Sequence, residues 1–175
     1  PDPTTYKILE KNLLPFQTYS KLENLAVGNL KGNVDFYLNP IHSGDNSPIK
    51  GSENWDKISV PSCDLDSYLV SQKINDVGLI KIDVQGGELN CLKGANRSIT
   101  TMLPIIVCEI SNFSDYRIKL KTELTRYLEE ELLNKLGYKP YIISSSGISK
   151  VDDLKKINSS NIWFIHEDNS FEALK

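Results

Sequence analysis

The chain has 175 residues, and its 20 Lys and Arg residues against 23 Asp and Glu residues give a net charge of −3. With 39% hydrophobic and 25% charged residues, this composition is typical of a globular domain and excludes a disordered or fibrous chain. The acidic balance argues against nucleic-acid binding, and no apolar run approaches the ~20 residues that span a bilayer. Cys63, Cys91 and Cys108 fit neither a disulfide framework nor a metal site. We therefore expect a cytoplasmic protein that binds no nucleic acid, membrane or metal.

The first half of the chain predicts two helices, three strands and a long loop. Asp2 can cap the first helix, and Pro3 suits its first position because its missing N–H would be unpaired there in any case. Alternating apolar residues over 33–38 predict a half-buried strand. The other predictions are the end of the first helix at Pro15, strands ending near Gly28 and over 58–60, a loop over 39–54 and a short helix over 65–69.

The second half alternates strands and helices more clearly. A nearly continuous apolar run over 77–84 predicts a strand buried on both faces, and Gly86-Gly87 predicts a turn after it. Apolar residues at helical spacing then predict a helix over 88–99. The remaining predictions are a strand over 104–110, a helix over 114–136 that stops at Gly137, and strands over 141–143 and 162–165 joined by a loop with Gly147.

This order of elements predicts the α/β class. Alternating strands and helices favour a mostly parallel, Rossmann-like sheet with helices on both faces. The last two predicted strands have no long helix between them, so we expect an antiparallel closing edge. In such sheets a ligand binds at the carboxyl ends of the strands, near the switch in strand order.

Charged residues are predicted at these strand ends. Asp83 ends one strand, Lys81 lies two residues earlier and points to the same face, and Glu109 ends the following strand. We therefore expect the three side chains to meet at one edge of the sheet. A structural role is the alternative, in which Asp83 caps the next helix, Lys81 pairs with Glu109, and Glu88 offsets the helix dipole.

The segment around Asp83 also resembles a known family. Residues 79–95 read LIKIDVQGGELNCLKGA, and this stretch is similar to the signature of FkbM-type methyltransferases. The stretches 1–12, 24–36 and 136–138 agree with the same family, so the resemblance covers almost the whole chain. It implies an O-methyltransferase with the class I Rossmann-like fold that depends on S-adenosylmethionine. The family commonly has a glutamate where this chain has Gln85, so a role for that carboxylate is not expected here.

The resemblance also implies which residues contact S-adenosylmethionine. It places Asp2 beside the ribose and adenine, Ala26 and Val27 beside the adenine ring, and Asp83, Val84 and Gln85 at the sulfonium end. On the residues alone, Asp2 is also a helix cap, a role compatible with the first. Packing in the core is the alternative for Ala26 and Val27.

Two features of the family pattern are not found in the sequence. Class I methyltransferases hold the cofactor with a glycine-rich loop after the first strand and an acidic residue after the second, and the chain opens at Pro1 without either. We therefore expect residues 1–175 to be the carboxyl-terminal part of a single methyltransferase domain that lacks the first strand–helix–strand unit. Such a part would bind the cofactor poorly or not at all.

Methyl transfer requires donor and acceptor to be held in line and a proton to be removed from the acceptor. The candidate catalytic residues are Asp83, Lys81, Glu109 and His42, although a solvated loop histidine is the alternative for His42. The resemblance implies that the acceptor is a hydroxyl of a sugar, a glycan or a small metabolite. The competing hypothesis is a non-catalytic Rossmann-like binding module that lacks its cofactor half and acts through a partner chain. The oligomeric state does not follow from the sequence.

Overall fold

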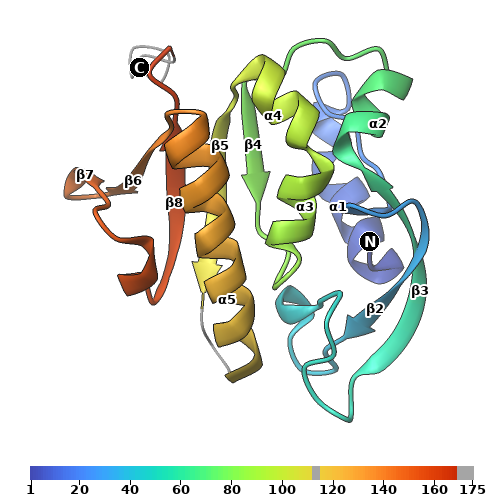
Figure 1. Cartoon of the computed structure of the whole chain (residues 1–175). Coiled ribbons are helices and arrows are strands. Elements are labelled where there is room, and N and C mark those ends of the chain that lie inside the picture. The colour runs from blue at the N-terminus through green and yellow to red at the C-terminus, as the bar shows by residue number, and fades with distance from the viewer. Residues whose placement is uncertain (112–114, 169–175) are drawn as a thin grey trace.

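The computed structural model describes residues 1–111 and 115–168, which form an α/β protein with two sheets (Figure 1). The helices are α1 (Pro3–Leu13), α2 (Leu65–Ser71), α3 (Glu88–Gly94), α4 (Asn96–Met102) and α5 (Asp115–Tyr127), which continues as a π-helical segment over Leu128–Lys135. The strands are β1 (Ala26–Gly28), β2 (Gly32–Leu38), β3 (Asp56–Asp64), β4 (Leu79–Ile82), β5 (Ile105–Ser111), β6 (Lys139–Ser144), β7 (Gly147–Lys150) and β8 (Ser159–Ile165). None of the helices in the described ranges is long and apolar enough to cross a membrane.

Local chemistry explains the first helix. The Asp2 carboxylate accepts hydrogen bonds from the Thr4 N–H at 2.8 Å and the Thr5 hydroxyl at 2.6 Å, and Pro3 occupies the first helical position. The predicted cap is therefore confirmed. None of the helix's own residues is buried, so α1 is a peripheral helix.

The strands form two separate sheets rather than one. The smaller sheet has the order β1-β3-β2, and the larger sheet has the order β4-β5-β8-β6-β7. Among the strand pairs of the described residues, only β1–β3 and β4–β5 are parallel. The α/β class and the antiparallel closing edge are confirmed. The single, mostly parallel sheet was a wrong prediction, because β8 returns antiparallel to β5 and the short β6–β7 connection allows only an antiparallel hairpin.

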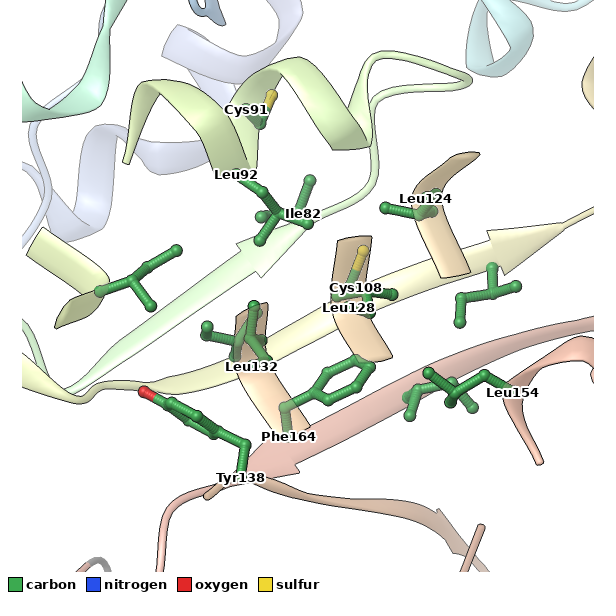
Figure 2. Packing of buried hydrophobic residues seen from close by; sticks show 14 of the residues in the cluster. Ile82, Cys91, Leu92, Cys108, Leu124, Leu128, Leu132, Tyr138, Leu154 and Phe164 are labelled. Atoms are coloured by element: carbon green, nitrogen blue, oxygen red, sulfur yellow. The ribbon is translucent and has the colours of Figure 1, made fainter. Parts of the chain in front are cut away.

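The main core lies between the larger sheet and the helices α3, α4 and α5 (Figure 2). Phe164 of β8 is fully buried in it, together with Leu92 of α3 and Leu128 beyond α5. Ile82, Ile106 and Cys108 of β4 and β5 belong to the same cluster. The three helices cover one face of this sheet, yet β5 is buried on both of its faces, since the four consecutive residues 105–108 are all buried.

β4 is buried on one face only, which corrects the expectation of burial on both faces. Ile82 is buried beneath the helices, whereas Leu79 is 47% exposed and Lys81 is exposed. Among the strands of the described residues, β4 is the end strand of its sheet and pairs only with β5. In the described residues, no helix covers the second face of β4, although helices were predicted on both faces of the sheet. The apolar run predicted a strand, but a run of apolar residues does not show whether another element packs on each of its faces.

Two further elements differ from prediction. The helix expected over 88–99 breaks at Ala95, where φ is −109° and ψ is 9°. The Asp66 carboxylate from α2 accepts hydrogen bonds from the backbone N–H groups of Arg97 and Ser98, both at 2.8 Å, and so caps α4 as a separate helix.

β7 lies where a loop was expected, and its residues are all exposed. Ser114, the expected start of the long helix, lies outside the described residues.

α3 joins the two sheets (Figure 1). One side of it packs in the core of the larger sheet through Leu92, and the other side meets β1. The Cys91 thiol donates a hydrogen bond to the Val27 carbonyl at 2.9 Å. At Gly94 the contact is so close that an added Cβ would lie 1.8 Å from the Gly28 carbonyl oxygen. α3 therefore sets the position of β1 relative to β4.

Candidate functional site

A cavity of about 340 Å³ lies between the small sheet and the turn that follows β4 of the larger sheet. This volume is at the lower end of the range for small-molecule sites, about 300–1,000 Å³. The walls come from the start of α1, from β1 and β2, from the loop between β2 and β3, and from the turn after β4. Its lining residues include Asp2, Tyr6, Glu23, Leu25, Ala26, Val27, Phe36, Asn46, Pro48, Asp83, Val84 and Gln85.

The six residues predicted to contact a cofactor all line this cavity, although they come from three distant parts of the sequence. Asp2 both caps α1 and lines the cavity, so its two predicted roles are compatible in the structure. Val27 is 39% exposed, and Ala26 is partly buried, so neither belongs to the buried core. Contact of these residues with a ligand stays a prediction.

The predicted acidic site is present at the carboxyl end of β4, and it contains one more residue than expected. The Lys81 ammonium pairs with Asp83 at 2.7 Å. The Gln85 side-chain amide donates to Asp83 and to Glu109, both at 3.2 Å. Asp83 does not cap α3, whose N-cap Gly87 has no side-chain cap, and Lys81 pairs with Asp83 rather than with Glu109. Gln85 thus joins Asp83, which follows β4, to Glu109, which lies within β5 rather than at its predicted end, since that strand continues to Ser111.

The two carboxylates have different proton affinities. The hydrogen bond from Lys81 holds the pKa of Asp83 below its ordinary value, although partial burial opposes it. Burial raises the pKa of Glu109, and the negative charges of Asp83 and Glu88 raise it further. Of the pair, Asp83 is therefore the carboxylate that stays ionised, and Glu109 is the one that holds a proton more readily.

We expect Glu109→Gln to stabilise the protein at neutral and higher pH. In the folded state the pKa of Glu109 lies above its ordinary value of 4.5, so stability falls as pH rises from there through the folded pKa. The variant loses this penalty, and its advantage disappears below about pH 4, where the carboxyl is protonated in both states. Urea unfolding from pH 3 to pH 8 measures the difference. Glu130→Gln, at an exposed position, is the control; a Glu109→Gln advantage that does not change with pH would contradict the assignment.

A buried carboxylate organises the turn between β4 and α3. Glu88 is 7% exposed, and it accepts hydrogen bonds from the Val84 N–H at 3.2 Å and from the Gly86 N–H at 3.0 Å. Gln85 has φ of 53° and Gly86 has φ of 102°. A left-handed conformation costs a residue with a side chain about 1–3 kcal/mol, so Gln85 is held there by its surroundings. The sequence pattern suggested only a dipole effect for Glu88, because its hydrogen bonds depend on the shape of the turn.

The loop between β2 and β3 closes one side of the cavity. The Asn46 amide donates to Asp2 at 3.2 Å, and the Ser47 hydroxyl donates to the Gln85 carbonyl at 2.6 Å. Sequence reasoning missed both residues, because a polar loop carries no periodicity that singles out individual side chains. His42, from the same loop, is exposed and does not line the cavity. The structure therefore does not bring this candidate base to Asp83.

The cavity is acidic. Asp2, Glu23 and Asp83 contribute carboxylates, and among the described residues that line it there is no Lys, Arg or His. Such a lining favours a ligand that carries positive charge. Across the described ranges, no group of three or more His, Cys, Asp or Glu side chains is arranged to hold a metal ion.

Comparison with known proteins assigns the chain to a family. Residues 1–140 match the family model described as the methyltransferase FkbM domain. No curated protein and no solved structure matched the chain. The match covers 140 of the 175 residues and includes the cavity, the acidic site and the turn that joins them. The chain therefore belongs to the FkbM methyltransferase domain family.

Proposed function

We propose that the protein is an O-methyltransferase that binds S-adenosylmethionine in the cavity and methylates a hydroxyl of a sugar, a glycan or a small metabolite. The observation that carries the proposal is the meeting of Asp2, the Ala26–Val27 strand and the Asp83–Gln85 turn around one acidic cavity. Membership of the FkbM family supports a methyltransferase in general.

The lining fits the chemistry of the cofactor. Ala26, Val27 and Phe36 offer an apolar wall of the kind that suits an aromatic base. The Asp83 carboxylate offers negative charge to a positively charged sulfur. When bound, S-adenosylmethionine supplies a methyl group that the sulfonium has already activated for displacement. The chain's residues then have to orient the acceptor, exclude water and accept its proton.

Asp83 is the carboxylate that lines the proposed cofactor cavity, whereas Glu109 is the one with the raised proton affinity. A general base works best when its pKa lies near the operating pH, and the pKa of Glu109 is raised whereas that of Asp83 is lowered. Glu109 lines a much smaller cavity of about 20 Å³, and the turn over 85–87 lies between the two cavities. In this proposal Lys81 keeps Asp83 ionised, and Gln85 links Asp83 to Glu109.

Val27→Arg is expected to weaken binding of S-adenosylmethionine and of S-adenosylhomocysteine by a similar factor. Val27 lies in the apolar wall proposed to contact the adenine ring, which both compounds carry, so the larger side chain would block the base in either case. We expect a Kd of about 0.1–1 mM for the unchanged chain, because the apolar wall and few polar groups supply only about 4–5.5 kcal/mol. Titration followed by NMR shifts of the residues that line the cavity measures both affinities.

Val70→Arg is the matched control, because Val70 is 62% exposed on α2 and does not line the cavity. No shift at the cavity with either compound would overturn cofactor binding by this chain and favour the non-catalytic binding module. The acceptor class is tested separately, by following radiolabelled methyl groups into hydroxylated sugars, glycans and metabolites. A product methylated on nitrogen or carbon would overturn the hydroxyl assignment.

A further inference from the structure

Ser47 is a buried residue in an otherwise solvated loop. It is 1% exposed, whereas four of the five residues before it are exposed. Its hydroxyl donates to the Gln85 carbonyl at 2.6 Å and accepts from the Ile49 N–H at 3.0 Å. Its backbone N–H and carbonyl both pair with Tyr37 of β2, at 3.0 and 2.8 Å. The hydroxyl is therefore fixed on the small sheet and reaches across to the turn after β4.

The residue that Ser47 holds is strained and joins the two carboxylates. Gln85 has a left-handed φ of 53°, which side chains rarely adopt without support. Its carbonyl accepts from Ser47, and its side-chain amide donates to Asp83 and Glu109. The loop also packs tightly on the turn, since a Cβ at Gly86 would lie 2.8 Å from the Ile49 side chain. The conformation of the Gln85 backbone sets the direction of its side chain, so a bond to the carbonyl also affects the amide bridge.

We propose that Ser47 is a positioning residue, which fixes Gln85 so that its amide bridges Asp83 and Glu109 at the end of the larger sheet. A role of Ser47 in catalysis rests on the proposed function. The effect of Ser47 on the position of Gln85 does not, because it concerns only contacts within this chain. Among the described residues, the other charged groups near the pair are Lys81 on β4, Glu88 on α3 and Lys121 on α5, which lines the same small cavity as Glu109.

The test is a carbon-13 NMR titration of the Asp83 and Glu109 carboxyl groups in Ser47→Ala and in the unchanged protein. A hydrogen bond donated to an ionised carboxylate favours its charged form. Loss of the bridge should therefore move the titration midpoints upward, by about half a pH unit, or about threefold in proton affinity. Ser52→Ala, an exposed position in the same loop, should leave both midpoints unchanged.

A purely structural role for Ser47 would lower stability without moving these midpoints. If folded Ser47→Ala titrates like the unchanged protein, the proposal is wrong. If Ser47→Ala does not fold, Ser47→Cys, which keeps the volume with a weaker donor, decides by the same criterion. The titration needs no ligand, so absence of S-adenosylmethionine binding would overturn the proposed function and leave this result intact.

Discussion

Gly94→Ala is expected to destabilise the protein by about 2–4 kcal/mol. Alanine is normally better than glycine inside a helix by about 1 kcal/mol, so local propensity predicts the opposite sign. Packing decides the outcome, because the new Cβ would lie 1.8 Å from the Gly28 carbonyl oxygen and 2.8 Å from its carbon. These are backbone atoms of β1, so α3 and the small sheet have to move apart. Urea unfolding at pH 7 measures the change in the free energy of unfolding.

Gly78→Ala is the matched control, since an added Cβ there meets nothing within 4 Å. Its effect should stay within about 0.5 kcal/mol. Displacement of β1 also moves Val27, which lines the cavity, so NMR shifts at the cavity should change in Gly94→Ala and not in Gly78→Ala. A Gly94→Ala protein as stable as the control would mean that α3 does not set the spacing of the two sheets.

The elements with strong local signals were predictable from the sequence. Asp2 and Pro3 predict the start of α1 because capping depends only on neighbouring residues. The alternation over 33–38 likewise predicts β2. β7 was missed because an exposed edge strand needs no apolar face. The break at Ala95 was missed because the cap of α4 comes from Asp66, about thirty residues earlier in the chain.

The sequence identified the charged residues of the site, but not the hydrogen bonds that join them. Asp83, Lys81 and Glu109 were identified because charges at the ends of adjacent strands meet at one edge. The sequence singled out Gln85 as a cofactor contact implied by the resemblance and as a departure from the family pattern, but not as a bridge between the carboxylates. Its bridging amide depends on a left-handed backbone that no spacing reveals. Ser47 reaches the turn across 38 positions of sequence, a contact that follows from the tertiary fold alone.

Glu88, the first residue of α3, is the second position at which a substitution is expected to change stability strongly. Glu88→Ala is expected to lower the free energy of unfolding by about 3–4 kcal/mol, because the backbone N–H groups of Val84 and Gly86 lose a charged acceptor in a partly buried turn. Glu88→Gln keeps one acceptor oxygen and should lose about half as much. Urea unfolding at pH 7 compares both with Glu130→Ala, at an exposed position, which should stay within about 0.5 kcal/mol.

The same substitution tests whether the turn and the acidic site form one unit. Without Glu88, nothing holds the Gly86 N–H on the helix side, and the left-handed Gln85 is supported only by its remaining partners, Ser47 among them. The amide bridge to Asp83 and Glu109 should therefore loosen in Glu88→Ala, and the NMR signals of the Gln85 amide should change together with those of Val84. If stability falls while these signals stay as in the unchanged protein, Glu88 serves only the fold, and the acidic site is built without it.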